Sequence, residues 1–547
     1  MYLCYDIKGI QRFIFSVPKL KCIVGGSSLI AEMDEWAKSL ATSPAIERIF
    51  SGGGRGAFFC ENQGTAQDLK DKLLSRAHDS GLDIRFGHAK TLSEAVLGAE
   101  ELYPYCPKDL SGEPCQLSGI WPLGSQPSKY GEKLVHPNIK LRLDKARKDS
   151  LGEGLIQELR DLNLVPALIA EYELEFLSNV NPRSDSNSKE EMDSARCGYK
   201  ALGSRNRWAI IAMDGNDMGR QFASFDEIRQ KLGLSESDQR EWLKRMSSEL
   251  NQCTRQAFLH ALGKVLADWT DQRRRANDMG SCVISDSQGT KSLILPFRPL
   301  ILGGDDVTVL CHCEYAMTFV REMSERFTEL SKNASSKAKT EGLSVSLWPA
   351  TSDRLSISAG VLFLKTTFPL SMGIPYADSL LASAKGKFRE SADSKSAATP
   401  AVDWETITDT LVDTPGARRR RELCFKDEDL DMTIELFQRP HPILAKHGAP
   451  PTGLPLLDQI IKRLKDLPRS IQADLSQALT RPYSERIRFV TSIAKRNPNL
   501  KDFLWELGTE PGPGWRDSPD GKTRSTAVLD ALSLLDEKHR MDNPTDA

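Results

Sequence analysis

Short apolar segments alternate with amphipathic segments in the first part of the chain. The apolar segment YLCYDI is followed by an amphipathic stretch from about Ser28 to Leu40, and two apolar segments then flank the glycines of IFSGGGRGAFFC. A second amphipathic stretch, GTAQDLKDKLLSRAHDSG, precedes the apolar segment IRFGHAK. The resulting order of strand, helix, strand, strand, helix and strand predicts a ferredoxin-like or palm unit.

The same order of elements returns in the middle of the chain. WAIIAMDGNDMG predicts a strand, LILGGDDVTVLC two strands joined by a turn, and LSISAGVLFLK a further strand. The helical segments between them include a long insertion from Ser224 to Arg275. The sequence therefore predicts an α+β protein with two ferredoxin-like palm units.

The patterning divides the 547 residues into parts, as expected for a chain too long for one core. Residues between the palms are rich in Pro, Gly, Ser and charge, and the C-terminal part reads as helices with proline breaks. Its segment SPDGKTRSTA is predicted to be poorly ordered. The predicted units are a first palm at 1–104, a linking domain at 105–202, a second palm at 203–405 and a C-terminal helical domain at 406–547.

Composition narrows the class of protein only slightly. Hydrophobic residues make up 39% and charged residues 27%, and the formal net charge is −2, so nothing in the bulk charge demands nucleic acid. The 11 cysteines follow no regular spacing, which favours free thiols in a reducing compartment. No apolar run approaches the roughly 20 residues of a membrane span, and the N-terminus has no signal-peptide layout. A cytoplasmic protein without membrane contact is predicted.

Three aspartates carry the candidate chemistry. Asp214 ends a predicted strand in MDGNDMG, and Asp305 and Asp306 occupy the turn of LGGDDV. Taken alone, the Asp214 motif is better explained as an ordinary Asp-Gly turn, and the GGDD motif is equally a hairpin turn or a metal-binding turn. In a palm, however, the first strand and the hairpin of the next two strands lie side by side, so these carboxylates would face one point. Such a cluster suits two divalent cations and nucleotidyl transfer.

An ordered set of motifs identifies a family resemblance. DIKGIQRFIFS, GGSSLI, MDGNDMG, LGGDDVTVL, ISAGVLFLKTTFPL and YADSLLASAKGK follow one another along both predicted palms. In this order they resemble the large subunit of type III CRISPR effector complexes, the palm proteins that make cyclic oligoadenylates from ATP in antiviral defence. GGDEF cyclases share the palm but lack the paired arrangement.

The resemblance implies roles for individual residues. Mg²⁺ or Mn²⁺, two ions in the active palm, would be held by Asp214, Gly215, Asp305 and Asp306, of which the three aspartates would be catalytic. ATP would be bound by Ser27, Ser28, Gly215, Asn216, Asp217, Gly303, Gly304 and Lys385. The first palm has Gly54-Arg55 where the second has Asp305-Asp306, so it is expected to hold no metal and to support a second ATP. Lys385 is equally read as a solvated helix residue.

The chain also departs from the family pattern. Its His78-Asp79 pair lies within a predicted helix without further ligands, so no HD nuclease is expected. Cys106, Cys115 and Cys197 form no CxxC pair, and even with His136 an eroded zinc site is the favoured interpretation. Cys311 and Cys313 are expected in the core.

Two questions of partnership follow from the same sequence. The run Arg418–Arg421 is read as a solvated basic turn or as a contact for RNA or an acidic partner. The resemblance implies ATP, other CRISPR effector subunits, guide RNA and target RNA as partners. The alternatives are a stand-alone antiviral cyclase and a nucleotide-binding scaffold subunit without turnover.

Overall fold

The computed structural model describes most of the chain. The described residues are 1–17, 19–41, 44–100, 128–130, 133–146, 149–177, 207–285, 289–343, 345–351, 353–389, 398–408, 413–444, 452–498, 501–508 and 515–539.

The N-terminal unit is a four-stranded antiparallel sheet with the strand order β2-β3-β1-β4. Its elements are β1 (Tyr2–Ile7), α1 (Ile10–Phe15), α2 (Leu20–Ser39), β2 (Ile46–Gly52), β3 (Arg55–Cys60), α3 (Gln63–Ser80), β4 (Ile84–Ala89) and α4 (Leu92–Glu100). This order and connectivity are those of the predicted ferredoxin-like palm.

The central unit repeats this arrangement on a larger scale. Its first four strands lie in the order β11-β12-β8-β13, and β14 and β17 extend the sheet. Its main elements are β8 (Arg207–Gly215), α8 (Met218–Leu232), α9 (Glu236–Arg275), β11 (Phe297–Gly303), β12 (Asp306–His312), α10 (Ala316–Thr340), β13 (Ile357–Lys365), α11 (Leu370–Arg389), β14 (Ala401–Thr406) and β17 (His441–Pro442). The predicted α+β fold with two palms is confirmed.

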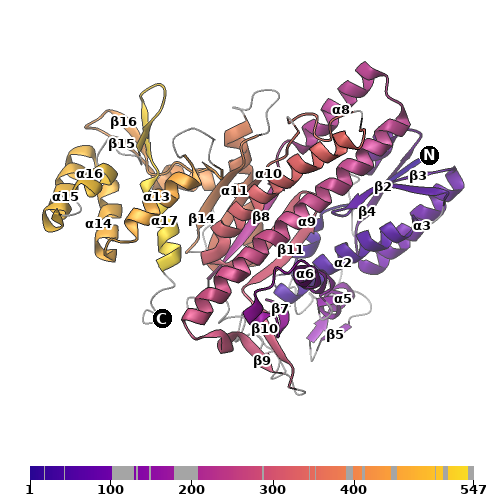
Figure 1. Ribbon diagram of the computed structural model, residues 1–547, viewed down its shortest axis with the longest axis horizontal. Coiled ribbons are helices and arrows are strands. Elements are labelled where there is room, and N and C mark those ends of the chain that lie inside the picture. Colours follow the sequence, from indigo (N-terminus) through magenta and orange to yellow (C-terminus); the bar gives the residue numbers. More distant parts are fainter. Residues whose placement is uncertain are drawn as a thin grey trace.

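Helices cover the central sheet on both faces. The helices α9 and α10 lie side by side across one face, as Figure 1 shows. On the other face α11 packs onto β13, where a Cβ atom at Gly360 would lie 2.2 Å from the carbonyl oxygen of Ala377. In the first palm Gly87 of β4 allows the same close approach by α4. The repeat therefore includes the helix after the fourth strand.

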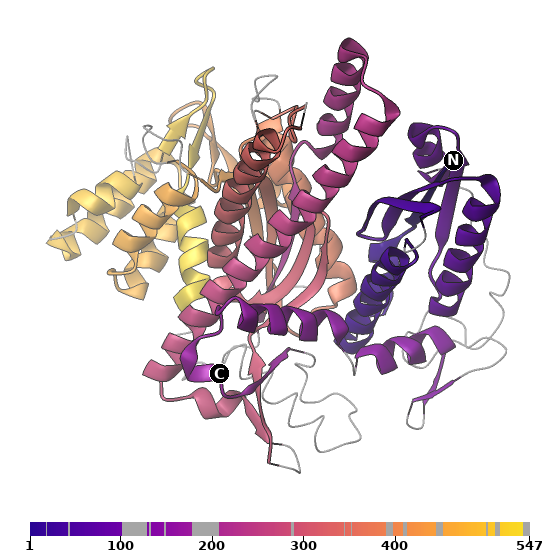
Figure 2. The same ribbon diagram turned by 45° about the vertical axis from the view of Figure 1, so that its right-hand side comes forward.

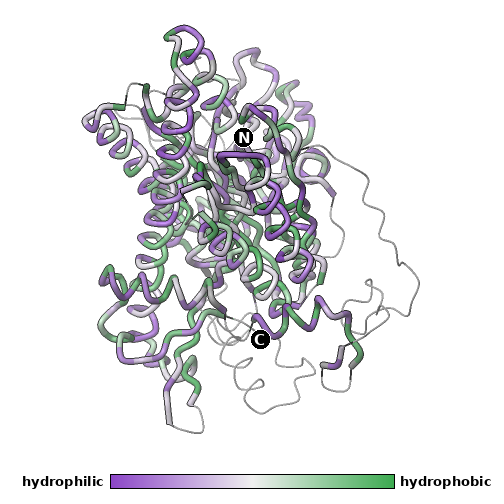
Figure 3. Tube along the Cα trace, turned by 90° about the vertical axis from the view of Figure 1, so that its right-hand side faces the viewer, coloured by the Kyte–Doolittle hydropathy of each residue, from purple (hydrophilic) through white to green (hydrophobic). Residues whose placement is uncertain are grey.

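The hydrophobic pattern explains why β8 lies at the centre. Seven of its residues in a row, from Arg207 to Met213, are buried, as expected for a strand covered on both faces. The 40-residue helix α9 begins at Ser235, where Ser235 and Asp238 form a capping box. Figure 3 shows apolar segments concentrated inside the molecule and hydrophilic segments on the outer turns of the helices.

The first palm lies beside the edge strand β11 of the second palm, as Figure 2 shows. Between the palms, the linking residues contribute β5 (Ser128–Tyr130), β6 (Lys133–Val135), α5 (Pro137–Ala146), α6 (Ser150–Asp161) and β7 (Glu173–Phe176). The strand β7 pairs in parallel with β10 (Lys291–Leu295), which also pairs with β9 (Val283–Ser285). The linking region thus forms a small sheet with the two strands that follow the long helix α9.

The helix α2 differs from its prediction. It begins at Leu20 rather than near Ser28, and Gly25 and Gly26 lie inside it instead of ending a loop. A Cβ atom at Gly25 would lie 1.8 Å from the backbone carbonyl oxygen of Arg142 in α5. Gly25 is therefore required by a close helix crossing. A sequence pattern reads such a glycine as a break.

Replacing Gly25 by Ala is expected to destabilise this crossing. The added methyl group would overlap backbone atoms of Arg142, which cannot move as a flexible side chain can. Overpacking of this kind typically costs about 1–3 kcal/mol or more. Gly26→Ala is the matched control, because its Cβ atom would make only a 3.4 Å contact with Ile14. Thermal unfolding of both variants should show a lower midpoint for Gly25→Ala, and equal midpoints would contradict this packing.

The C-terminal part is mixed rather than helical throughout. Its helices are α12 (Pro415–Glu422), α13 (Leu454–Leu464), α14 (Arg469–Leu479), α15 (Tyr483–Arg496), α16 (Lys501–Gly508) and α17 (Val528–His539). They accompany a four-stranded sheet of β15 (Cys424–Asp427), β16 (Met432–Glu435), β19 (Thr523–Thr526) and β18 (Trp515–Asp517). The segment SPDGKTRSTA, predicted as poorly ordered, forms the turn and second strand of the β18–β19 hairpin. Strands of three or four residues are too short to show a clear alternation.

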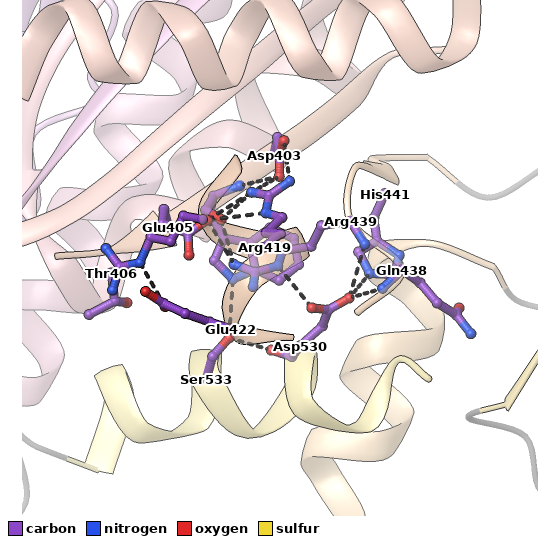
Figure 4. Close-up of polar contacts among 12 residues, drawn as sticks. Asp403, Glu405, Thr406, Arg419, Glu422, Gln438, Arg439, His441, Asp530 and Ser533 are labelled. Atoms are coloured by element: carbon purple, nitrogen blue, oxygen red, sulfur yellow. Dashed lines mark hydrogen bonds and ion pairs between the residues drawn. The ribbon is translucent and has the colours of Figure 1, made fainter. Parts of the chain in front are cut away.

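The basic run at 418–421 is also corrected in part. Arg419 is 4% exposed and donates to both carboxylate oxygens of Asp403 and to Glu405, both on β14. Figure 4 shows this network continuing to Arg439, His441 and Asp530. The half-buried Arg418 and the exposed Arg421 pair with Glu422 instead. The run is therefore neither a free basic turn nor an open RNA contact at its centre, because Arg419 joins α12 to the second palm.

Among the described residues, every helix is too short or too polar to cross a membrane.

Candidate active site

The GGDD turn lies where two strands of the second palm end. Gly303 of β11 pairs with Asp306 of β12, and Gly304 has a φ angle of +63°, which glycine adopts without strain. In the neighbouring ladder Val307 pairs with Met213, so that Asp306 and Asp214 each come one residue beyond this pair. The structure thus brings the predicted turn and the end of β8 together.

Gly215 allows Asp305 to approach β8. A Cβ atom at Gly215 would lie 2.8 Å from Oδ2 and 3.0 Å from Cβ of Asp305. The carboxylate of Asp305 therefore packs against the backbone directly after Asp214. The three predicted catalytic aspartates lie in one cluster, as the sequence predicted from palm topology.

The three carboxylates lie close together at a largely buried site, where their negative charges repel one another. Burial, with the charges of Asp214 and Asp306, raises the pKa of Asp305 well above its ordinary value. Burial and the charge of Asp214 raise the pKa of Asp306 to about 7, against the opposing effect of Lys385. A carboxylate cluster of this kind attracts a cation.

Lys385 supplies the cation nearest to Asp214. Its Nζ atom forms an ion pair with Asp214 and donates to the carbonyl oxygen of Gly215 (2.8 Å). The interpretation of Lys385 as a solvated helix lysine is therefore wrong, whereas its predicted contact with nucleotide phosphates remains untested. The ammonium group of Lys385 thus contacts Asp214 and Gly215, two of the predicted metal ligands.

The donor atoms suit Mg²⁺ or Mn²⁺. Both ions prefer oxygen, and the ends of β8 and β12 offer three carboxylates and the Gly215 carbonyl oxygen. Within the described ranges, no three His, Cys, Asp or Glu side chains already have the arrangement of a metal site. Since Lys385 binds two of the predicted ligands, a metal ion there would take the place of its ammonium group.

Two cavities meet at Asp214. The larger, of about 400 Å³, lies between the palms and is also lined by Ser27, Asp306 and Lys385. The smaller, of about 190 Å³, is lined by Asp305 and by the residues 214–219. Asp214 and Asp306 therefore border a space lined by residues of both palms, whereas Asp305 borders a cavity of the second palm.

The predicted serines of the first palm lie differently from their prediction. Both are inside α2, so the free amides of a helix start are absent there. Ser27 lines the larger cavity and donates to the carbonyl oxygen of Leu300 in β11. Ser28 is 1% exposed, and its hydroxyl group has no hydrogen-bond partner within the described part of the chain. Ser27 thus connects the palms, whereas Ser28 does not line either cavity at Asp214.

The residues after Gly215 have structural partners of their own. Asn216 donates to the hydroxyl group of Ser356 (2.9 Å), and Asp217 accepts from the backbone amide of Ala398 (3.2 Å). Both nevertheless line the smaller cavity. Their side chains hold the chain after β8, and their predicted contact with nucleotide remains a prediction.

Sequence reasoning missed two buried acids at this site. Asp378 of α11 lines the larger cavity, and burial together with the charge of Asp214 raises its pKa to about 6. It precedes Lys385 by two helical turns, a spacing that could have placed both residues on one helix face. Asp34 of α2 lines the same cavity, but its position inside an amphipathic pattern gave no signal.

Asp34 holds the glycine turn of the first palm. Its carboxylate accepts from the backbone amide of Gly54 (3.0 Å) and from the hydroxyl group of Tyr5 (3.2 Å). The following residue, Arg55, is turned to Asp6, to which its Nε atom donates (3.2 Å). The first-palm turn therefore has a structural acid behind it, whereas the second-palm turn carries its acids at the tip.

Asp34→Asn is expected to gain stability relative to the native protein as the pH rises. Burial raises the pKa of Asp34 from 3.8 to about 6, so the folded protein favours the neutral carboxyl group. The stability this group contributes is complete below about pH 3.8 and is lost as the pH rises through about 6. Asn cannot ionise and avoids this loss, which amounts to about 3 kcal/mol at most. Unfolding midpoints of both proteins between about pH 4 and pH 7 test this, and a difference independent of pH would contradict it.

The residues considered for a zinc site, and the two cysteines expected in the core, lie away from the aspartate cluster. Cys106, Cys115 and Cys197 fall outside the described residues. His136 accepts at Nδ1 from the backbone amide of Asn138 (3.2 Å) at the start of α5. Cys311 and Cys313 are buried, as predicted.

Comparison with known proteins agrees with the geometry of the second palm. Residues 207–392 match the family described as Cas10/Cmr2, second palm domain. This segment therefore resembles the second palm domain of Cas10/Cmr2 proteins. The match to that family begins at the first residue of β8 and includes all three aspartates of the cluster.

The chain is also similar to solved structures. A chain of the Csm1-Csm4 cassette in complex with cA4 shares 14% identity over 98% of this chain and 68% of that chain, with a TM-score of 0.42. The cassette in complex with pppApA gives 14% identity, 98% and 69% coverage and a TM-score of 0.43. The apo cassette gives 13% identity, 98% and 69% coverage and a TM-score of 0.42. No curated protein sequence matches the chain.

Proposed function

We propose that this chain is the large subunit of a type III CRISPR effector complex and makes cyclic oligoadenylates from ATP. The observation that carries the proposal is the cluster of Asp214, Asp305 and Asp306 within a Cas10/Cmr2 second palm domain. It borders a cavity of about 400 Å³ to which both palms contribute. A scaffold without turnover has no need of three carboxylates held together at such an electrostatic cost.

The proposed reaction is nucleotidyl transfer between two ATP molecules. The 3′-hydroxyl oxygen of one nucleotide forms a bond to the α-phosphorus of the other, pyrophosphate leaves, and the hydroxyl proton passes to solvent. In the last step the 3′-hydroxyl oxygen of the oligonucleotide forms a bond to the α-phosphorus at its own 5′ end. Pyrophosphate leaves again, and the ring closes. Mg²⁺ or Mn²⁺, held by the three aspartates and the Gly215 carbonyl oxygen, would supply charge stabilisation for the pyrophosphate and acidify the attacking hydroxyl group.

The residues of the chain have separate parts in this proposal. The aspartates provide the negative site, and Lys385, once released from Asp214, provides positive charge for a phosphate group. The first palm closes the cavity with Ser27 and the glycine turn around Gly53. Partners proposed from the family are other CRISPR effector subunits, guide RNA and target RNA.

Replacing Lys385 by Met is expected to increase affinity for Mn²⁺. In the absence of metal, the Lys385 ammonium group binds Asp214 and Gly215, which are both proposed ligands. Removing this competing charge should tighten Mn²⁺ binding by about tenfold, since opposite charges at contact distance interact by a few kcal/mol near a protein surface. Electron paramagnetic resonance of bound Mn²⁺ measures the change.

Lys387→Met provides the matched control for this prediction. Lys387 lies on the same helix but donates to the backbone carbonyl oxygens of Gln438 and Pro440, away from the aspartates. Its replacement should leave Mn²⁺ affinity unchanged. Weaker binding in Lys385→Met would show that the lysine supports the metal instead of competing with it.

Pyrophosphate release tests the proposed function. The purified chain, alone and assembled with its complex, is incubated with ATP and Mg²⁺ or Mn²⁺, with and without RNA complementary to the guide. Release that requires complementary RNA supports the RNA-guided enzyme, and release by the chain alone supports the stand-alone cyclase. ATP binding without release under any of these conditions would overturn both in favour of a scaffold.

A further inference from the structure

The glycine turns of the two palms touch each other. A Cβ atom at Gly303 would lie 3.2 Å from both the Cα and the nitrogen atom of Gly53. Gly53 has a φ angle of +64° and presents only backbone to its neighbour. The turn that carries the aspartates therefore rests directly on the turn of the palm that lacks them.

Asn251 of α9 reaches both turns. Its Oδ1 atom accepts from the backbone amide of Gly304 (3.0 Å), the residue directly before Asp305. Its Nδ2 atom would lie 3.4 Å from a Cβ atom at Gly52, and it donates to the carbonyl oxygen of Ser247 (3.1 Å). One side-chain amide thus hydrogen-bonds the tip of the second-palm turn and its own helix, and lies beside the first-palm turn.

Asn251 is held firmly by its helix. The flanking residues Leu250, Cys253 and Thr254 are all buried, and Thr254 donates to the carbonyl oxygen of Leu250 (3.0 Å). The half-buried Asn251 also lines a cavity of about 670 Å³ together with Gly52 and Gly304. Because α9 packs along β2 as well as along the second palm, the contact of Asn251 is backed by both units.

A neutral amide suits this position for an electrostatic reason. The first-palm turn is held by the acid Asp34, which accepts from Gly54, whereas the second-palm turn is held by an amide. An acid at 251 would add a negative charge close to Asp305 and Asp306, whose pKa values are already raised. Asn supplies the same acceptor oxygen without that charge.

We infer that Asn251 is a positioning residue that fixes the GGDD turn against the first-palm turn. The inference rests on the proposed function for its effect on catalysis, but the contact itself can be tested without activity. By accepting from the Gly304 amide, Asn251 fixes the backbone of the turn and thereby the orientation of the Asp305 and Asp306 side chains. The first palm thereby contributes to the position of carboxylates that it does not contain.

Hydrogen exchange of the backbone amides is the first test. Asn251→Leu keeps a similar volume and removes the acceptor, whereas Asn251→Asp keeps the acceptor. Faster exchange is expected in Asn251→Leu for peptides covering 300–310 and also 50–56, with Asn251→Asp remaining close to the native protein in both. Ser248→Ala is the control, since Ser248 is exposed and lines the same cavity. Unchanged exchange at 300–310 in Asn251→Leu would overturn the inference, and a change there without one at 50–56 would overturn the coupling of the turns.

Steady-state kinetics with ATP and Mn²⁺ is the second test. Asn251→Leu should lower kcat by at least about tenfold with KM for ATP changed less than about threefold, because the turn is displaced while the nucleotide cavity between the palms remains. Asn251→Asp should recover only part of the lost kcat, because it restores the acceptor but adds a negative charge close to Asp305 and Asp306. Equal kcat in Asn251→Leu and the native protein would overturn the positioning role. If the native protein itself is inactive, the proposed function fails, and the exchange experiment still decides whether Asn251 holds the turns.

Discussion

Replacing Asp305 and Asp306 together by Ala is expected to lower the rate of ATP conversion by at least about 1000-fold. A factor of this size corresponds to about 4 kcal/mol of transition-state stabilisation. The variant would retain Asp214 but lose two of the three carboxylates that border the two cavities meeting at Asp214. Pyrophosphate release in the presence of Mg²⁺ or Mn²⁺ measures the loss.

The same variant should fold at least as well as the native protein when a chelator is present. Burial and the charge of Asp214 raise the pKa values of both aspartates, so their charges oppose the folded state in the absence of a cation. Addition of Mn²⁺ should raise the unfolding midpoint of the native protein but not of the variant. Asp431→Ala, at an exposed position, serves as the control. A native rate of conversion in the double variant would contradict the assignment of these residues.

Replacing Arg419 by Met is expected to cause the largest loss of stability. Arg419 is 4% exposed, and its guanidinium group donates to Asp403 and Glu405, whose charges raise its pKa further above the ordinary value. Removing one partner of a buried ion pair leaves uncompensated charge and typically costs about 3–5 kcal/mol. The carboxylates left without this partner would be those of Asp403 and Glu405 on β14, between β13 and the short edge strand β17.

Arg421→Met is the matched control on the same helix. The Arg421 side chain is 63% exposed and pairs with Asp413 and Glu422 at the surface. Exposed pairs of this kind contribute little to stability, so its unfolding midpoint should equal that of the native protein. Similar midpoints for Arg419→Met and Arg421→Met would contradict a structural role for the buried network shown in Figure 4.

The repeated palm could be predicted because its strands follow a simple physical rule. The apolar segment before Asp214 and the glycine turn before Asp305 both marked strand ends, and palm topology placed these ends side by side. The turn sequences also separated the palms, since Gly54-Arg55 cannot offer the two carboxylates of Asp305-Asp306. The fold and the cluster of three aspartates were therefore accessible from the sequence.

Other features depend on contacts between distant parts of the chain. Gly25 of α2 is required by the backbone of Arg142, more than a hundred residues later, and no local pattern reveals such a contact. The burial of Arg419 required two acids on β14 that no spacing in the basic run reveals. The contact of Asn251 with Gly304 joins a long helix to a turn and leaves no periodic signal.

The short strands of the C-terminal part illustrate a different limit. The strands β18 and β19 have three and four residues, so that apolar and polar positions cannot alternate often enough to indicate a strand. Their segment contains Pro519 and Gly521, which favour a turn. The pairing becomes evident only from the register between Trp515 and Thr526.

Identification of the reaction products by mass spectrometry tests the central claim most directly. The purified protein, assembled with its guide and complementary RNA, is incubated with ATP and Mn²⁺ beside the Asp305→Ala, Asp306→Ala variant. The account predicts cyclic oligoadenylates and pyrophosphate from the native protein and neither product from the variant. ADP and phosphate as the products, or cyclic oligoadenylates in equal amount from the variant, would contradict it.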